Sequence, residues 1–313
     1  MFIKFSLICL LVFTSTIDFC WGDVSEKRGG LQAKPRKYNL SICAVFNDEA
    51  RYLKEWIEYH RLIGVDHFYL YNNDSTDESV DVLMPYVKNQ IVTLTYWPNG
   101  LGFYFHEDDG FTWTLSTQIP AYENAAKYLA VNQTEWLVFL DVDEFLVPSK
   151  YDTLTKILES YPDCPGVRIS SDFFDASKRD TPRKRNLVIQ TTELTKPPEE
   201  NAQKAIEKTI FRPEFCESFI WPPYRWVFKY NQCAVDIPMR KLRINRYINR
   251  YKDYSEITVT SKPKLPIDNR MLTEDATKEL LEAGYEIEDQ ERVIFRFLPE
   301  LFRKMGYKAA SGW

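Results

Sequence analysis

The sequence lacks several features that identify common binding sites. None of its 11 glycines lies in a G-x-G-x-x-G or G-x-x-x-x-G-K-[ST] loop, which excludes the usual backbone cradles for phosphate. Its 6 cysteines do not have the spacing of a zinc site, and its 3 histidines all precede residue 107. The formal net charge of −5, with basic residues scattered along the chain, is not typical of a nucleic-acid binder. We therefore expect no nucleic-acid partner.

Long hydrophobic runs are also scarce. The apolar run from Phe5 to Phe13 is too short to cross a bilayer. It follows Lys4 and precedes Cys20-Trp21-Gly22, which is the pattern of a secretory signal peptide. We expect residues 1–22 to direct the chain into a secretory pathway (ER or Golgi lumen, or secretion) or to a bacterial envelope. The alternative is an uncleaved anchor, and only in that case do we expect a membrane as a partner.

Four cysteines remain once Cys9 and Cys20 are set aside with the signal peptide. In an exported chain they can form disulfides, and Cys216 with Cys233 is the pair we expect. Cys43 lies in a predicted core strand, so we expect it to be a buried free thiol. Three triplets also fit the N-glycosylation sequon: Asn39-Leu-Ser41, Asn73-Asp-Ser75 and Asn132-Gln-Thr134.

The pattern of apolar residues predicts an α/β fold. Short apolar runs at 40–46, 67–71 and 91–97 predict strands, and segments with a helical period separate them. Ser75 and Glu78 are expected to form a capping box at the start of the second helix. This β-α-β-α-β order is typical of a parallel sheet with crossover helices.

The remaining segments suggest where the domain begins and ends. We expect a linker at 23–38, a single domain at 39–255 and a C-terminal helical extension at 256–313. A strand is predicted at 166–170. Four further strands are predicted to form an antiparallel extension: 207–211, 219–221, 225–235 and 241–251.

Polar residues follow the predicted parallel strands. They are Asn47, Asp48, Glu49, Asn72, Asn73 and Asp74. Because parallel strands end at the same edge of a sheet, these amides and carboxylates should gather there, at the edge where α/β folds bind ligands. We expect a nucleotide to bind at this edge.

The most informative stretch is the apolar run Trp136 to Leu140 followed by Asp141-Val142-Asp143. Residues two apart in a strand share a face, so the two aspartates are expected to present their oxygens together. Carboxylate oxygens suit Mg²⁺ or Mn²⁺, and such a cation can hold a diphosphate. The alternative for an isolated pair of this kind is a solvated acidic turn.

Seven short motifs stand out along the chain. They are Asn47-Asp-Glu49, Glu55-Trp-Ile-Glu-Tyr-His60, Asn73-Asp-Ser-Thr-Asp77, Gln118 with Asn124, Trp136 to Pro148, Lys208-Thr-Ile-Phe-Arg-Pro213 and Ile244-Asn-Arg-Tyr247. Together they resemble the motifs of glycosyltransferases of the family 92 and family 2-like group, and the resemblance covers about residues 40–255.

The resemblance implies a GT-A fold, with a mostly parallel sheet, and a metal-dependent hexosyl transfer. The donor would be a nucleotide sugar, often UDP-linked, and the acceptor a hydroxyl of a glycan or glycoconjugate. Mn²⁺ or Mg²⁺ would be held with the donor phosphates by Asp141 and Asp143. The residues placed near the nucleotide are Asn47, Glu49, Asn72, Asp74 and Gln118.

One motif departs from the family pattern at Arg246, where the related sequences usually have histidine. Arginine cannot bind a cation, but its guanidinium can bind a phosphate directly. The alternatives to an active transferase are an impaired relative that binds a nucleotide or glycan, and a secreted interaction protein. The aromatic residues Trp221, Tyr224 and Trp226 are candidates for sugar stacking, although core packing is the simpler explanation.

An inverting transferase also needs a base for the acceptor hydroxyl. Asp172 and Asp175 follow a predicted strand and are the candidates for this role.

Overall fold

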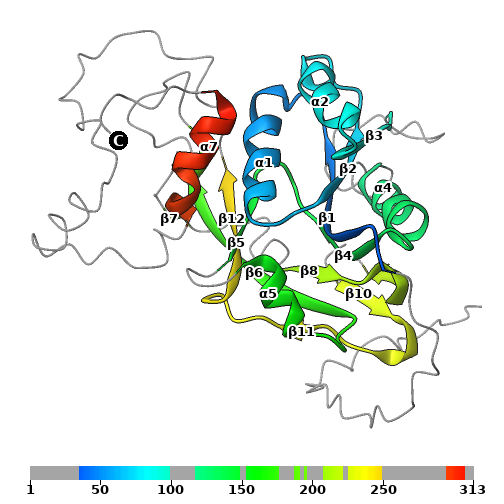
Figure 1. Cartoon of the computed structure of the whole chain (residues 1–313). Helices are drawn as coiled ribbons and strands as arrows, with labels where there is room; N and C mark the ends of the chain where they lie inside the picture. Colours follow the sequence, from blue (N-terminus) through cyan, green and yellow to red (C-terminus); the bar gives the residue numbers. More distant parts are fainter. Residues whose placement is uncertain are drawn as a thin grey trace, which may run out of the picture. The chain divides into compact units, whose positions relative to one another are not determined.

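The computed structural model describes residues 35–98, 117–148, 153–175, 187–190, 194–195, 207–220, 225–248 and 294–306. They form a ten-stranded mixed sheet flanked by helices, with a separate two-stranded sheet (Figure 1). The predicted α/β fold class is therefore confirmed. In the described part of the chain, no helix is long and apolar enough to cross a membrane.

Some predicted features lie outside the described residues. These are the signal peptide at 1–22, most of the linker at 23–38, residues Trp221 and Tyr224, the side chain of Trp226, and most of the helical extension at 256–313.

The first half of the chain forms the parallel part of the sheet. Its strand order is β3-β2-β1-β4, and each of these neighbours is parallel. The β-α-β-α-β prediction is thus confirmed, with β1 between β2 and β4. The elements are β1 (Tyr38–Phe46), α1 (Ala50–Leu62), β2 (His67–Asn72), α2 (Ser79–Lys88), β3 (Val92–Tyr96), α4 (Ile119–Asn124) continued by a π-helix (Ala125–Ala130), and β4 (Thr134–Phe139).

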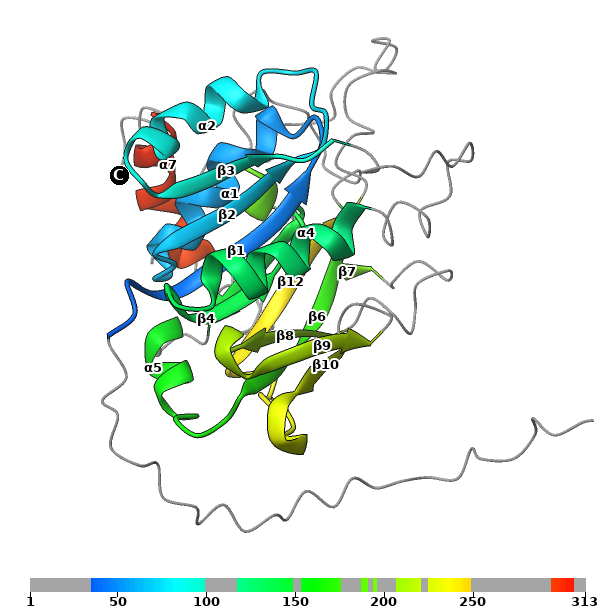
Figure 2. The same cartoon turned by 90° about the vertical axis from the view of Figure 1, so that its right-hand side faces the viewer.

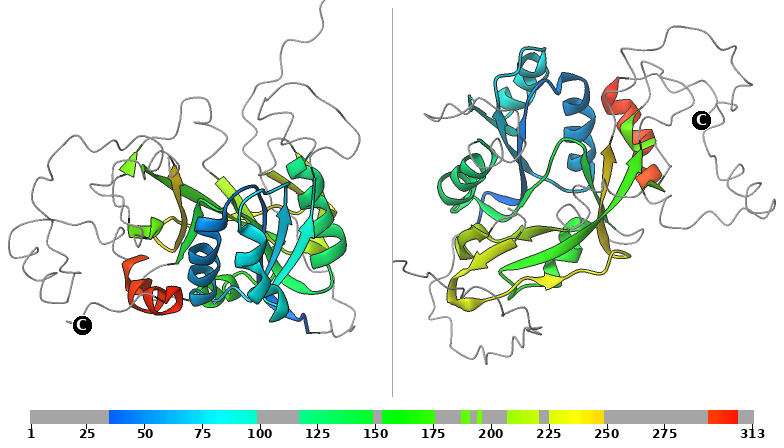
Figure 3. Two further views of the ribbon diagram at one scale, coloured as in Figure 1. Left: turned by 90° about the horizontal axis from the view of Figure 1, so that it is seen from above. Right: turned by 180° about the vertical axis from the view of Figure 1, so that it is seen from behind.

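Side chains of β1 alternate between two hydrophobic cores. Ile42 and Ala44 belong to the core that includes helix α1, whereas Cys43 and Val45 belong to the core that includes helix α4. Figures 2 and 3 show α1 and α4 on opposite sides of β1. A strand covered on both faces is apolar at nearly every position, which explains the apolar run from Ile42 to Phe46; the buried Ser41 hydroxyl is hydrogen-bonded to that of Thr134.

The later strands extend the same sheet, and the predicted antiparallel pairing is confirmed in part. The order continues β4-β8-β6-β12-β5, with β7 and β11 beside β6, and β9 and β10 form the separate two-stranded antiparallel sheet. Strand β8 is antiparallel to β4 and β6, whereas β12 is antiparallel to β5 and parallel to β6. The elements are β5 (Glu144–Pro148), α5 (Leu154–Glu159), β6 (Gly166–Asp175), β7 (Leu194–Thr195), β8 (Glu207–Phe211), β9 (Cys216–Ile220), β10 (Arg225–Phe228), β11 (Val235–Asp236), β12 (Leu242–Ile248) and α7 (Leu298–Met305).

Two local predictions are wrong. Cys216 and Cys233 do not form a disulfide; Cys43 is a buried free thiol, as predicted. Ser75 does not cap α2, which begins at Ser79. Instead, the Ser75 hydroxyl accepts a hydrogen bond from the N–H of Asp48 at 3.0 Å. This bond ties the loop after β2 to the loop after β1.

Helix α1 fixes the backbone of β5 through buried aromatic side chains. Trp56 Nε1 donates to the carbonyl of Glu144 and the Tyr59 hydroxyl donates to that of Leu146, each at 2.8 Å. The N–H of Leu146 donates to His60 Nε2 at 3.2 Å. Residues 55–60 therefore place the strand that begins at Glu144.

Burial keeps His60 neutral. It lowers the pKa of His60 from 6.5 to about 3, since the charged imidazolium loses its hydration in the core. A neutral ring is also what the structure requires, because Nε2 must accept a hydrogen bond from Leu146.

We expect the free energy of unfolding to fall as the pH is lowered from 7 to 5. Below pH 6.5 the unfolded chain protonates His60 while the folded chain does not, which costs up to about 1.4 kcal/mol per pH unit. Above pH 6.5 this effect vanishes. Urea unfolding at pH 7, 6 and 5 should show that the free energy of unfolding falls less steeply for His60→Gln than for the wild type. The His60→Gln variant keeps an amide oxygen that can still accept the hydrogen bond from Leu146. Equal slopes for the two proteins would contradict this origin.

Candidate functional site

The carboxyl ends of the parallel strands meet at one edge of the sheet, as predicted. Phe46 of β1 lies beside Asn72 of β2, and Asn72 lies beside Tyr96 of β3. Leu140, just past β4, donates its N–H to the carbonyl of Cys43 in β1 at 3.1 Å. The loops that follow these strands therefore share the edge where α/β sheets bind ligands.

Two asparagines expected near a nucleotide help to hold these loops together. Asn47 Nδ2 donates to the carbonyl of Asn73 at 2.6 Å. Asn72 Oδ1 accepts the N–H of Ser75 at 2.9 Å, and Asn72 is buried. Both side chains thus shape the sheet edge, and a direct role toward a nucleotide stays a prediction.

Glu49 and Asp74 lie at the same edge. The N–H of Glu49, just before α1, donates to the Ser79 hydroxyl at 3.1 Å. Asp74 has a φ of +54° and accepts a hydrogen bond from the hydroxyl of Tyr96 at 2.6 Å. The exposed ring of Tyr96 therefore lies next to a carboxylate. Contacts of Glu49 and Asp74 with a nucleotide also stay predictions.

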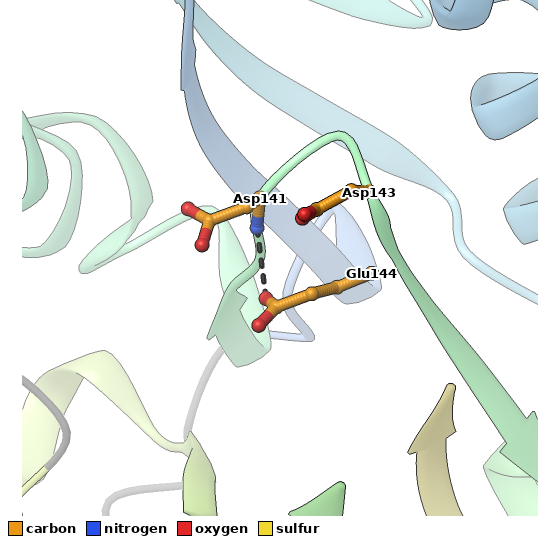
Figure 4. A group of neighbouring side chains, drawn as sticks. All are labelled: Asp141, Asp143 and Glu144. Atoms are coloured by element: carbon orange, nitrogen blue, oxygen red, sulfur yellow. Dashed lines mark hydrogen bonds between the residues drawn. The ribbon is translucent and has the colours of Figure 1, made fainter. Parts of the chain in front are cut away.

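Asp141, Asp143 and Glu144 form an acidic turn between β4 and β5 (Figure 4). One carboxylate oxygen from each lies within 4.8 Å of the others. The prediction that Asp141 and Asp143 present their oxygens together is confirmed, but the physical reason differs. Strand β4 ends at Phe139, so a turn rather than strand alternation brings the aspartates together.

Backbone hydrogen bonds hold the acidic turn in place. The N–H of Glu144 donates to the carbonyl of Asp141 at 3.0 Å, and the N–H of Asp141 donates to the Glu144 carboxylate at 2.9 Å. The N–H of Tyr247 in β12 donates to the carbonyl of Asp143 at 2.9 Å. The turn is thus fixed both by its own bonds and by β12.

Arg246 contacts all three carboxylates of the acidic turn. Its Nη2 lies 3.4 Å from Asp141, its Nε 3.4 Å from Asp143 and its Nη1 3.5 Å from Glu144. Strand pairing explains this position, because Arg246 of β12 lies directly opposite Glu144 of β5. The motif position predicted to bind phosphate therefore lies against the acidic turn.

Lys208 is a second cation in the cluster. Its Nζ lies 2.9 Å from Glu144 and 3.6 Å from Asp141. The Lys208 side chain is 2% exposed and that of Glu144 is 0% exposed. Burial raises the pKa of Glu144, and the positive charge of Lys208 is the main influence that lowers it again. A buried carboxylate and a buried ammonium thus compensate each other.

Gln118 also reaches the cluster, as expected for a site residue. Its Nε2 donates to Asp141 Oδ1 at 3.3 Å and to the hydroxyl of Tyr122 at 2.9 Å. Gln118 therefore links the start of α4 to the acidic turn, and whether it touches a ligand stays a prediction.

The two candidate bases do not follow a strand, because β6 runs from Gly166 through Asp175. Asp172 lies beside Asn245 on β12, so its side chain points to the opposite face from that of Arg246. It also pairs with Arg243 at 3.4 Å. Asp175, three positions further, points to the face of Arg246 and is the better placed of the two. A role as base stays a prediction for both.

Sequence reasoning missed Glu144 and Lys208 as members of the site. Glu144 directly follows Asp143, so the local sequence contained its signal. Lys208 begins one of the motifs that resemble the glycosyltransferase family, but nothing in that segment alone shows that its ammonium reaches Glu144. That contact depends on β8 and β5 belonging to one sheet.

The acidic turn has donor atoms suited to a hard divalent cation. Three carboxylates converge, and Mg²⁺ and Mn²⁺ prefer oxygen ligands. Among the described residues, the buried atoms Asp143 Oδ1 and Glu144 Oε1 accept no hydrogen bond. The ligand type and spacing therefore fit the predicted metal, although two cations already lie beside the same carboxylates.

Comparisons with known proteins identify a family and related sequences. A family model described as glycosyltransferase family 92 matches residues 36–280. A family 92 protein of Oryza sativa subsp. japonica is 27% identical over 217 residues, which cover 68% of this chain and 33% of that protein. A family 92 protein of Ricinus communis is 26% identical over 226 residues, which cover 67% of this chain and 35% of that protein. The chain thus spans about a third of the length of these curated relatives.

Solved structures offer only a distant likeness. Glucosyl-3-phosphoglycerate synthase from Mycobacterium tuberculosis, in complex with Mn²⁺, UDP and glucosyl-3-phosphoglycerate, is 14% identical with a TM-score of 0.32. The match covers 87% of this chain and 82% of that one. Similarity at this level says nothing about the substrate of this chain.

We expect Lys208→Met to lower the free energy of unfolding by about 3–5 kcal/mol, since it leaves the buried carboxylate of Glu144 without its ammonium partner. The double variant Glu144→Gln/Lys208→Met removes both charges and should recover most of the loss. Urea unfolding of the wild type and the two variants measures this. A double variant no more stable than the single one would show that the pair is not coupled.

Proposed function

Because the chain belongs to glycosyltransferase family 92, we propose that it moves a hexose from a nucleotide sugar to a hydroxyl of a glycan or other glycoconjugate. UDP is the first candidate for the nucleotide. The observation that carries this proposal is the acidic turn beside Arg246, at the sheet edge where α/β folds bind ligands.

The reaction requires one bond to form and one to break. The acceptor oxygen bonds to the anomeric carbon, the bond from that carbon to the donor diphosphate breaks, and the acceptor proton passes to a base. Arg246 is 23% exposed, so its guanidinium can reach a bound diphosphate and offset the charge that the leaving group gains. Lys208, buried behind Glu144, lowers the pKa of that carboxyl against the upward effect of burial and holds it in position.

A divalent cation held by Asp141, Asp143 and Glu144 would supply further positive charge to the departing diphosphate. The turn holds these carboxylates in place before any ligand arrives. Preorganised groups of this kind stabilise developing charge without further reorganisation.

Asp175 is the base we favour if the transfer inverts the anomeric centre. It lies at the end of β6 and, by strand alternation, points to the same face as Arg246. Asp172 is less suited, because it points to the other face and pairs with Arg243.

A second candidate function is nucleotide or glycan binding without turnover. It is favoured by one observation, the guanidinium of Arg246 lying against the carboxylates that would hold a metal. The secreted interaction protein considered from the sequence depends on Trp221, Tyr224 and Trp226, whose side chains lie outside the described residues.

We expect a nucleoside diphosphate with Mn²⁺ to raise the melting temperature of the chain. UDP, GDP and CDP should each be tested with Mn²⁺, with Mg²⁺ and with EDTA. Asp143→Asn should abolish the shift, since it removes a charge that the cation needs. The matched control, Asp163→Asn, changes an exposed aspartate outside the site and should keep the shift.

Turnover of the matching nucleotide sugar then separates the two candidate functions. Release of the nucleoside diphosphate in the presence of glycan acceptors supports the transferase. Binding without release supports the impaired relative. If none of the nucleotides shifts the melting temperature under any metal condition, the transferase and the nucleotide-binding relative both fail, and only glycan binding is left.

We propose that the chain works in a secretory compartment, and the sequons offer a test. Asn39 and Asn132 are exposed, whereas Asn73 is buried and its side chain donates to the carbonyl of Trp97 at 2.9 Å. After expression of the full chain in a eukaryotic secretory host, glycan mapping should find sugars on Asn39 or Asn132 and none on Asn73. A secreted, active protein with a glycan on Asn73 would contradict this structure of the loop.

A further inference from the structure

The three carboxylates of the acidic turn already share a resident cation. A single guanidinium, that of Arg246, places a different nitrogen against each of them, at 3.4, 3.4 and 3.5 Å. A divalent cation held by the same residues would depend on carboxylates whose oxygens Asp141 Oδ2, Asp143 Oδ2 and Glu144 Oε1 now lie against Arg246. The arginine and the ion are therefore alternatives for one set of anions.

The charges of the cluster show how strong this competition is. Among the described residues, the cations paired with the three carboxylates are Arg246 and Lys208. A divalent ion at the carboxylates is repelled by these two positive groups, at distances where charges in a protein still interact strongly. The free chain should therefore bind the ion only weakly.

The two cations of the cluster differ in their freedom to move. Lys208 is 2% exposed and pairs with the fully buried Glu144, so it must stay where it is. Arg246 is 23% exposed, and its three contacts are longer than good charge-assisted hydrogen bonds. Arg246 is thus the cation that can leave.

A diphosphate gives the guanidinium another anion to bind. Arginine pairs with phosphate oxygens through two parallel N–H groups, a geometry that the single contacts to the acidic turn do not offer. Once the arginine turns to the phosphates, the carboxylates are released for the metal. The metal and the nucleotide would then each favour binding of the other.

We propose that Arg246 is a placeholder cation, which occupies the metal position of the acidic turn until a nucleoside diphosphate draws it away. The chain then binds the divalent ion and the nucleotide together and holds the ion poorly by itself. This inference rests on the proposed function for the identity of the second ligand, but the competition between Arg246 and the metal does not.

The test is the affinity of the full chain for Mn²⁺, measured from the electron paramagnetic resonance signal of the free ion. Without nucleotide, Arg246→Gln should bind Mn²⁺ about tenfold tighter or more than the wild type, because one competing charge is gone. Arg246→His, which puts a neutral ligand at the same position, should also gain affinity. Arg168→Gln, which removes a surface arginine paired with Asp236, should leave the affinity unchanged.

The second part of the experiment repeats the Mn²⁺ measurement with saturating UDP. UDP should raise the Mn²⁺ affinity of the wild type about tenfold or more, and should have a smaller effect on Arg246→Gln, where no guanidinium needs to move. Melting curves and circular dichroism confirm that each variant is folded. Arg246→His and Arg246→Gln are both compared with the wild type. If one of them misfolds, the Mn²⁺ affinity of the other still tests the inference.

The outcomes separate the inference from the proposed function. If Arg246→Gln and Arg246→His bind Mn²⁺ no tighter than the wild type, the placeholder role is wrong, whatever UDP does. If the variants gain Mn²⁺ affinity but UDP binds to none of the proteins, the competition stands and the proposed nucleotide is wrong. A UDP effect equally large in wild type and Arg246→Gln would overturn the movement of the arginine.

Discussion

The structure of this site depends on placing three carboxylates in one tight turn while pairing their negative charges with cations. Asp141, Asp143 and Glu144 repel one another at 4.8 Å or less, and Glu144 is also cut off from water. Charges buried in this way persist only when they are paired. The chain supplies that pairing from two other strands, through Lys208 of β8 and Arg246 of β12. The long mixed sheet is therefore a requirement of the site as well as its support.

The elements around the turn act as its scaffold. Helix α1 fixes β5 through Trp56, Tyr59 and the neutral ring of His60. Strand β12 holds the turn by the N–H of Tyr247 and also carries Arg246. The proposed transfer, in which a diphosphate departs, gains from groups held in position beforehand. The motifs shared with family 92 thus have physical reasons that extend beyond direct contact with substrates.

The sequence predicts the local structure better than the long-range contacts. The strands around Ile42 and Leu70 were predictable because a buried parallel strand is apolar nearly throughout. The proximity of Asp141 to Asp143 was also predicted, but a turn after β4 produces it rather than strand alternation. The position of Asp172 was not predictable, since whether a strand continues through polar residues depends on its neighbours in the sheet. The same applies to Lys208, whose partner Glu144 is set by the strand order. The expected Cys216–Cys233 disulfide failed because cysteine count alone does not place thiols together.

A crystal structure of the chain grown with UDP and Mn²⁺ is the most direct test of the site. We expect an anomalous manganese peak against Asp141 and Asp143, with the diphosphate beside it and the guanidinium of Arg246 turned from the carboxylates to a phosphate oxygen. A diphosphate bound elsewhere on the chain, or a manganese peak away from the acidic turn, would contradict the assignment of this turn as the donor site.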